Sequence, residues 1–166
     1  MDILIEFDIE RELWRNCSSM TNRYSPWTGE FSMVELTTLE ARAARALAAV
    51  ADAAAAKGLA VAITVVDPAG ILQAFHRMDG ALSGPVEVSQ KKARTAALFG
   101  SDTADFGTGA SPGGEIYSIE HTNGGLITFG GGVVLRTGAR LAGGLGVAGA
   151  SVAADEQLAR VGAAAF

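Results

Sequence analysis

Cysteine and histidine are almost absent from this sequence. Cys17 is the single cysteine among 166 residues, and the chain has 2 histidines. One cysteine excludes an intrachain disulfide and any cysteine-rich metal site, and the histidines lack the carboxylate-flanked spacing of a metalloprotease. We therefore expect no structural metal, and we interpret Cys17 as an inert thiol.

Basic residues and long apolar runs are also scarce. The net charge is -5, and no basic stripe interleaved with aromatic residues is present, which excludes a typical nucleic-acid binder. No run of about eighteen apolar residues suited to a membrane span occurs. The first ten residues, MDILIEFDIE, are acidic where a signal peptide is basic. The sequence predicts a cytoplasmic protein with neither a nucleic acid nor a membrane as its partner.

The first 36 residues differ in composition from the rest. They hold both tryptophans and the cysteine, and Ile3, Ile5, Phe7 and Ile9 alternate with mostly acidic residues. This alternation predicts a half-buried strand, whose free edge would promote aggregation if it stayed exposed. We expect residues 1–36 to be an N-terminal extension that pairs with a sheet edge or a neighbouring subunit, in a homo-oligomer that is a dimer or larger.

Residues 37–166 form a regular succession of predicted elements. Apolar periodicity and turn residues predict a helix at 38–57, strands at 59–66 and 71–78, a helix at 85–99, loops with short helical turns at 101–131, a hairpin at 132–149 and a helix from 151. The strand at 59–66 is apolar on both faces, as in a central strand. The order predicts an α+β fold, an antiparallel sheet of about five strands with helices on both faces.

A glycine motif precedes the last predicted helix. The sequence GLGVAG at 144–149 matches the G-x-G-x-x-G pattern of dinucleotide-binding loops. That loop needs a parallel crossover unit and an acidic residue about twenty positions further on. Residues 133–142 instead predict a hairpin, and no second strand follows the helix. We therefore expect no nucleotide cofactor, and the glycines require another explanation.

Four ordered motifs carry a family resemblance. They are VDPAGILQAFHRMDGA at 66–81, SQKKARTA at 89–96, FGGGVVL at 129–135, and GGLGVAG at 143–149 followed by Asp155. Together they resemble the GlcG/HbpS-like family over residues 37–166. The resemblance implies a profilin-like α-β-α arrangement of three layers, commonly assembled into dimers or larger oligomers. It also implies that the glycines at 144–149 lie in a core strand and serve close packing.

The resemblance implies one fold but several different functions. Members of the family include haem-binding proteins, accessory proteins of glycolate and diol catabolism, the C-terminal domain of PduO-type corrinoid adenosyltransferases, and a lyase acting on hydroxylaminobenzoate. It therefore implies a small-ligand-binding protein that holds haem or a related flat ligand at a subunit interface. The alternative is a cofactor-independent lyase or deaminase acting on a small aromatic acid such as a hydroxylaminobenzoate.

Three candidate residues lie at the end of the second predicted strand. His76 shares a predicted strand face with Leu72 and Ala74, so it is either a hydrogen-bonded, partly buried histidine or an axial ligand to haem iron. Arg77 and Asp79 form a corner, where a structural ion pair or turn cap competes with binding of a ligand carboxylate. In an enzyme, Asp79 would also transfer protons.

The loop around EHTNGG at 120–125 supplies further candidates. His121 is the second potential axial ligand, and in an enzyme His121 and Glu120 would transfer protons. Asn123 and Tyr117 are candidate ligand-binding residues, with surface packing as the competing role of Tyr117.

Helical geometry predicts different surroundings for two adjacent lysines. Lys91 follows Glu87 by four residues, which predicts a solvent-exposed ion pair. Lys92 lies on a largely apolar face, where an ammonium either extends to solvent or meets an anion. We expect Lys92 to bind a ligand anion.

Overall fold

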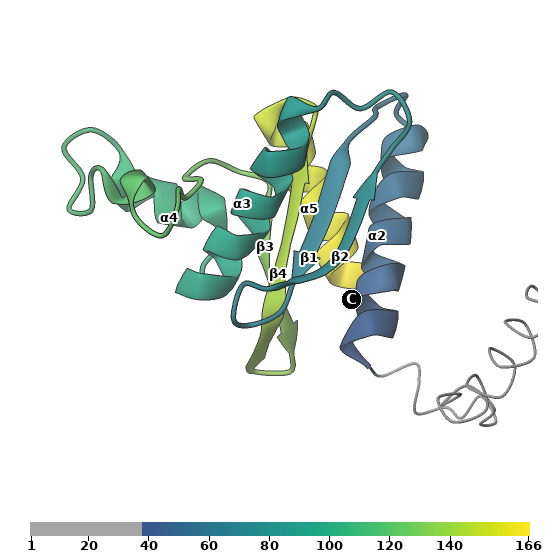
Figure 1. Cartoon of the computed structure of the whole chain (residues 1–166), viewed down its shortest axis with the longest axis horizontal. Helices are drawn as coiled ribbons and strands as arrows, with labels where there is room; N and C mark the ends of the chain where they lie inside the picture. Colours follow the sequence, from purple (N-terminus) through teal and green to yellow (C-terminus); the bar gives the residue numbers. More distant parts are fainter. Residues whose placement is uncertain (1–37) are drawn as a thin grey trace, which may run out of the picture. The chain divides into compact units, whose positions relative to one another are not determined.

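The structure, a computed structural model, describes residues 38–166, in which helices alternate with strand pairs (Figure 1). The elements in chain order are α2 (Leu39–Ala55), β1 (Ala62–Val66), β2 (Leu72–Arg77), α3 (Gly84–Phe99), α4 (Thr103–Ala110), the 3-10 turn η2 (Ile119–His121), β3 (Gly132–Thr137), β4 (Arg140–Ala148) and α5 (Val152–Ala165). The predicted extension at 1–36, with its alternating strand, lies outside the described residues and stays a prediction.

The strands form one antiparallel sheet in the order β2-β1-β4-β3. This confirms the predicted α+β class, and residues 38–166 contribute four strands to a sheet predicted to have about five. Strand β4 runs antiparallel to both of its neighbours. The glycine motif therefore lies in an antiparallel strand and not in a parallel crossover unit.

Helices cover both faces of the sheet (Figure 1). Helices α2 and α5 pack on one face, where the main core contains Val50, Ile63, Leu145 and Leu158. Helix α3 packs on the other face, with Ala93 and Ala97 against Val66. Strand β1 is buried on both sides, which confirms that the apolar run at 59–66 contributes a central strand.

Two glycines of β4 allow α3 to approach the sheet. A Cβ atom at Gly144 would lie 2.1 Å from the carbonyl oxygen of Ala93, and one at Gly146 would lie 2.0 Å from that of Ser89. Both contacts are with the helix backbone, which cannot move aside as a flexible side chain can. The glycine motif thus serves close packing between strand and helix.

The helix ends follow the capping signals of the sequence. Thr38 accepts a hydrogen bond from the Ala41 amide at 3.2 Å, and Ser151 accepts one from the Ala154 amide at 3.2 Å. Helix α3 ends at Gly100, which has a positive φ of 62°. Among residues 38–166, no helix is both long enough and apolar enough to cross a membrane.

Residues 111–125, which we name the arm, project away from the sheet beyond α4 (Figure 1). The arm is fixed at its base, where Nη1 of Arg94 donates to the carbonyl oxygen of Asn123 at 2.6 Å. Just beyond the arm, the Ile127 amide donates to Oγ1 of Thr95 at 3.1 Å. Helix α3 therefore positions the segment that returns to β3.

Candidate ligand-binding site

His76 lies on β2, an edge strand of the described sheet, beside a shallow apolar hollow. It pairs with Ile63 and so faces the α2 side of the sheet. The hollow has a volume of about 320 Å³ and is lined by Ala44, Leu47, Ala48, Ala51, Phe75 and His76. The His76 side chain is exposed and makes no hydrogen bond to any residue of 38–166. Within residues 38–166, His76 is therefore not the hydrogen-bonded, partly buried histidine of the first interpretation.

A β-bulge changes which residues share a face with His76. The register shifts between Val65 and Val66, so Val66 pairs with Leu72. Leu72 therefore turns toward the α3 side, whereas Ala74 remains packed against the main core. The expectation that Leu72 shares the face of His76 is wrong, because strict alternation fails at a bulge.

Arg77 closes the corner between β2 and α3. Its Nε and Nη2 atoms donate to the carbonyl oxygen of Ala81 at 2.9 and 2.5 Å. Asp79 is exposed and forms no salt bridge with Arg77 within the described part of the chain. The structure thus shows Arg77 as a turn cap, and binding of a ligand carboxylate by Arg77 stays a prediction.

Lys92 is fully buried and already has an anionic partner. Its Nζ atom lies 2.9 Å from Oδ2 of Asp155 and 2.8 Å from the carbonyl oxygen of Val147, and 5.0 Å from the ring centroid of Phe129. In the structure the anion that Lys92 meets is a carboxylate of the same chain, which corrects our expectation of a ligand anion.

The buried pair has electrostatic and structural consequences. Burial lowers the pKa of Lys92, and the neighbouring Asp155 carboxylate opposes that shift. Oδ1 of Asp155 accepts a hydrogen bond from the Ala150 amide at 3.0 Å. The pair therefore links α3 to the first turn of α5. By contrast, Lys91 forms the predicted ion pair with Glu87 at 2.8 Å and is partly exposed, so that prediction is confirmed.

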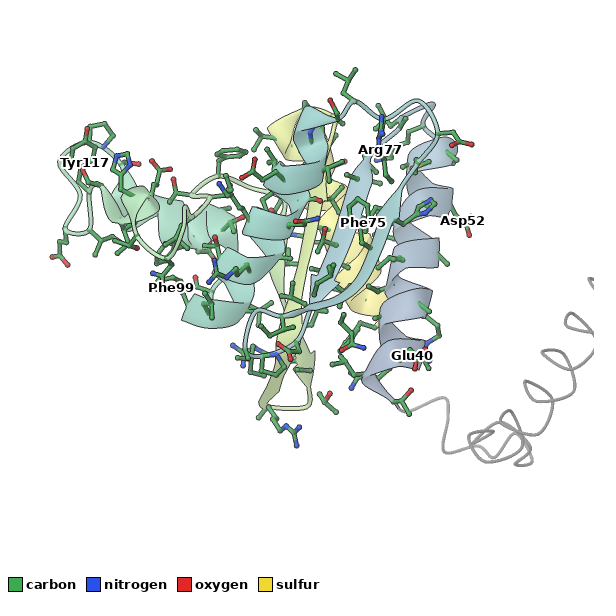
Figure 2. All side chains as sticks on the ribbon, viewed as in Figure 1. Glu40, Asp52, Phe75, Arg77, Phe99 and Tyr117 are labelled. Atoms are coloured by element: carbon green, nitrogen blue, oxygen red, sulfur yellow. The ribbon has the colours of Figure 1, made fainter. Side chains whose placement is uncertain are left out.

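The candidates of the arm lie far from those of β2. Tyr117 is 62% exposed and lies at the far end of the arm, whereas Arg77 lies at the end of β2, on the other side of α3 in this view (Figure 2). His121 is exposed in η2, and Glu120 accepts a hydrogen bond from Thr128. Arg77, the residue expected to hold a substrate carboxylate, is thus separated from the arm that carries Glu120 and His121, so the geometry gives the lyase or deaminase alternative no support.

Asn123 has a structural role visible in the backbone. It adopts a positive φ of 53°, and its side-chain amide donates to Oγ1 of Thr122 at 3.0 Å. Because its carbonyl oxygen accepts from Arg94, it belongs to the anchor of the arm. Ligand binding by Asn123 stays a prediction.

Sequence reasoning missed the partner of Lys92. Asp155 was identified as part of a motif but was not paired with Lys92, because 63 residues separate the two. The signal that was available is chemical, since a lysine on an apolar helix face needs a buried carboxylate or a ligand. Sequence reasoning paired the strand at 71–78 with that at 59–66 but did not predict that β2 lies at an edge of the described sheet, the position that exposes His76.

Comparison with known proteins identifies the family. Residues 39–164 match the family described as haem degrading protein HbpS-like. The chain belongs to this family. The corrinoid adenosyltransferase PduO of Citrobacter freundii is 38% identical over 107 residues, which are 64% of this chain and 32% of that protein. The chain thus spans about a third of the length of the curated relatives it matches.

Solved structures of HbpS-like proteins share the fold. The Klebsiella pneumoniae protein ORFY superposes with a TM-score of 0.75 at 32% identity, covering 78% of this chain and 89% of that one. The complex of PduOC with heme superposes with a TM-score of 0.72 at 32% identity, covering 75% of this chain and 91% of that one.

Proposed function

We propose that this HbpS-like chain binds haem, or a related flat aromatic ligand, in a pocket completed by a second subunit. The observation that carries the proposal is the solved complex of PduOC with heme, whose chain is similar to this one over 91% of its length. Identity of 32% over that span makes a shared ligand class a reasonable inference.

The hollow beside His76 supports this proposal by its composition. Ala44 and Ala48 present small side chains from α2, and Leu47 adds apolar surface. A flat macrocycle can approach such a wall closely, and its burial is favourable. The exposed imidazole of His76 makes no hydrogen bond with residues 38–166 and is a suitable axial ligand for haem iron. When bound, haem would supply redox-active iron.

The exposed position of the hollow supports an oligomer. Around β2 apolar side chains are unusually exposed, with Ile71 at 64% and Phe75 at 37%. An apolar edge strand of this kind is normally covered by another chain or segment. A second copy of the chain that covers β2 would give the shallow hollow its opposite wall.

Titration with haemin tests the proposal. The wild type is expected to develop a sharp Soret band that saturates at a fixed stoichiometry. Ala48→Glu places a carboxylate in the hollow, and we expect it to weaken haemin binding by about ten-fold or more, because burying an unpaired charge is costly. Ala55→Glu is the matched control, since Ala55 is exposed on the same helix outside the hollow.

The control variant should bind haemin as the wild type does. Absence of a saturable Soret band in the wild type would contradict haem binding by this chain. Equal affinities of the Ala48→Glu and Ala55→Glu variants would instead show that the ligand does not lie in the hollow beside His76.

A further inference from the structure

A second hollow lies on the opposite face of the sheet, between α3 and the edge strand. Its volume is about 250 Å³, and its lining includes Val66 and Leu72 from the strands and Gln90, Lys91 and Arg94 from α3. It therefore has room for a small organic molecule, with a cationic wall on one side and an apolar floor on the other.

Arg94 is held in position at the wall of this hollow. Gly70 packs against its stem, since a Cβ atom at Gly70 would lie 3.0 Å from Cγ of Arg94. Nη1 donates to the carbonyl oxygen of Asn123 at 2.6 Å. Nε and Nη2 make no further hydrogen bond within residues 38–166, so the fixed guanidinium retains donors suited to a carboxylate.

Lys91 adds a second cation beside Arg94. Its Nζ atom lies 2.8 Å from Oε1 of Glu87, whose side chain is 73% exposed. The Lys91 side chain also packs against Gly125, because a Cβ atom added at Gly125 would lie 2.9 Å from Nζ of Lys91. An exposed ion pair of this type contributes little stability, so Glu87 can give way to a ligand anion at small cost.

The floor of the hollow is apolar. The Thr64 hydroxyl is engaged with Oγ of Ser89 at 2.8 Å, which leaves Val66 and Leu72 as the surface that a ligand tail would contact. Leu72 is 55% exposed, so covering it would remove apolar surface from water. The Gln90 amide makes no hydrogen bond within the described chain and lies beside the cations.

We propose that this hollow binds a small aliphatic monocarboxylate. Arg94 and Lys91 hold the carboxylate, and the apolar tail lies over Leu72 and Val66. The site lies on the α3 face, whereas the His76 hollow lies on the α2 face. The proposal therefore does not depend on haem binding.

Calorimetric titration with 4-methylpentanoate tests the proposal, with 4-methylpentanamide as a neutral probe of the same shape. We expect the acid to bind about ten-fold or more tightly than the amide, because charge-assisted hydrogen bonds are the strong ones. Arg94→Gln is expected to weaken binding of the acid by a similar factor. Arg140→Gln is the matched control, because Arg140 is exposed on the β3–β4 hairpin, outside the hollow.

Further measurements test the role of the apolar floor and the independence of this site from haemin binding. Leu72→Asn should weaken the acid several-fold while leaving the fold intact in a thermal melt, since Leu72 is exposed. Haemin binding by Arg94→Gln should equal that of the wild type. Equal binding of acid and amide, equal affinities of the two arginine variants, or no saturable binding of the acid at millimolar concentration would overturn the proposal. Inorganic phosphate binding as tightly as the acid would also overturn it, because the tail would then have no role.

Discussion

Strands β1 and β2 belong to one hairpin, yet they differ completely in burial. All five residues of β1 are buried, whereas β2 has no buried residue. Strand β2 has three polar residues and β1 only Thr64, yet Leu72 and Phe75 of β2 are exposed as well, so composition alone does not account for the difference. Position does, because β1 lies in the centre of the sheet and β2 lies at the edge of its described part. The comparison indicates that apolar residues of β1 stabilise the fold, while those of β2 are available for ligands and subunits.

Polar residues show the same contrast. Near the centre, the ammonium of Lys92 has a carboxylate and a carbonyl partner within the chain. At the edge, the imidazole of His76 makes no hydrogen bond with residues 38–166 and borders an open hollow. A buried polar group must be satisfied for the chain to fold, whereas an exposed one is free to meet a ligand. Substitutions can test whether the central residues determine stability and the edge residues determine binding.

The largest effect is expected at the buried pair. Lys92→Ala leaves the carboxylate of Asp155 buried without its cation, and we expect the free energy of unfolding to fall by about 3–5 kcal/mol. Chemical denaturation measures this change. Lys91→Ala is the control at the adjacent position, where loss of a partly exposed ion pair should cost no more than about 0.5 kcal/mol. Similar losses in the two variants would contradict the assignment.

The double variant Lys92→Met with Asp155→Leu sharpens this test. Replacing both charges by apolar side chains is often neutral, so the double variant should be more stable than Lys92→Ala. A ligand role for Lys92 predicts instead that the double variant loses binding of haemin while keeping its stability. The two roles thus differ in which measurement changes.

A smaller loss is expected at the contact between β4 and α3. Gly146→Ala would place a methyl group against the α3 backbone, and overpacking of this kind costs about 1–3 kcal/mol. The control is Gly84→Ala in the first turn of α3, where nothing lies within 4 Å of an added Cβ atom. That variant should be neutral or slightly stabilising. Equal melting temperatures of the two variants would show that the glycine is dispensable.

The smallest effect on stability is expected near β2. Ile71→Asp changes an exposed side chain, so the free energy of unfolding should change by about 0.5 kcal/mol or less. The mass in solution should fall if β2 contacts a second copy, and light scattering measures it. Val161→Asp, at an exposed position of α5, should leave the mass unchanged. An unchanged mass for Ile71→Asp, or a fall for Val161→Asp, would place the interface elsewhere.

Local patterns in the sequence predicted most of the fold. Helix boundaries depend on residues close in the chain, such as the caps at Thr38 and Ser151 and the stop at Gly100, and these were predictable. The hairpin of β1 and β2 follows from its short turn for the same reason. The bulge that turns Leu72 to the α3 side was not predictable, because it depends on how two strands pair across the whole hairpin.

The candidate site was less predictable than the fold. Residue type and motif identified His76 and Lys92 as unusual, but their surroundings come from segments distant in sequence. Asp155 reaches Lys92 from α5, and the wall beside His76 comes from α2. The candidates of the arm are close to each other in sequence but distant from β2; they are Tyr117, Glu120, His121 and Asn123. How far they lie from β2 depends on the direction in which the arm projects.

Haemin titration of His76→Ala and His121→Ala tests the central claim most directly. Both histidines are exposed, so neither substitution should impair folding. The account predicts that His76→Ala weakens haemin binding by about ten-fold or more and shifts the Soret band, because an axial ligand is lost. His121→Ala should match the wild type in both respects. Loss of binding in His121→Ala with full binding in His76→Ala would contradict the claim that the ligand lies against the β2 edge.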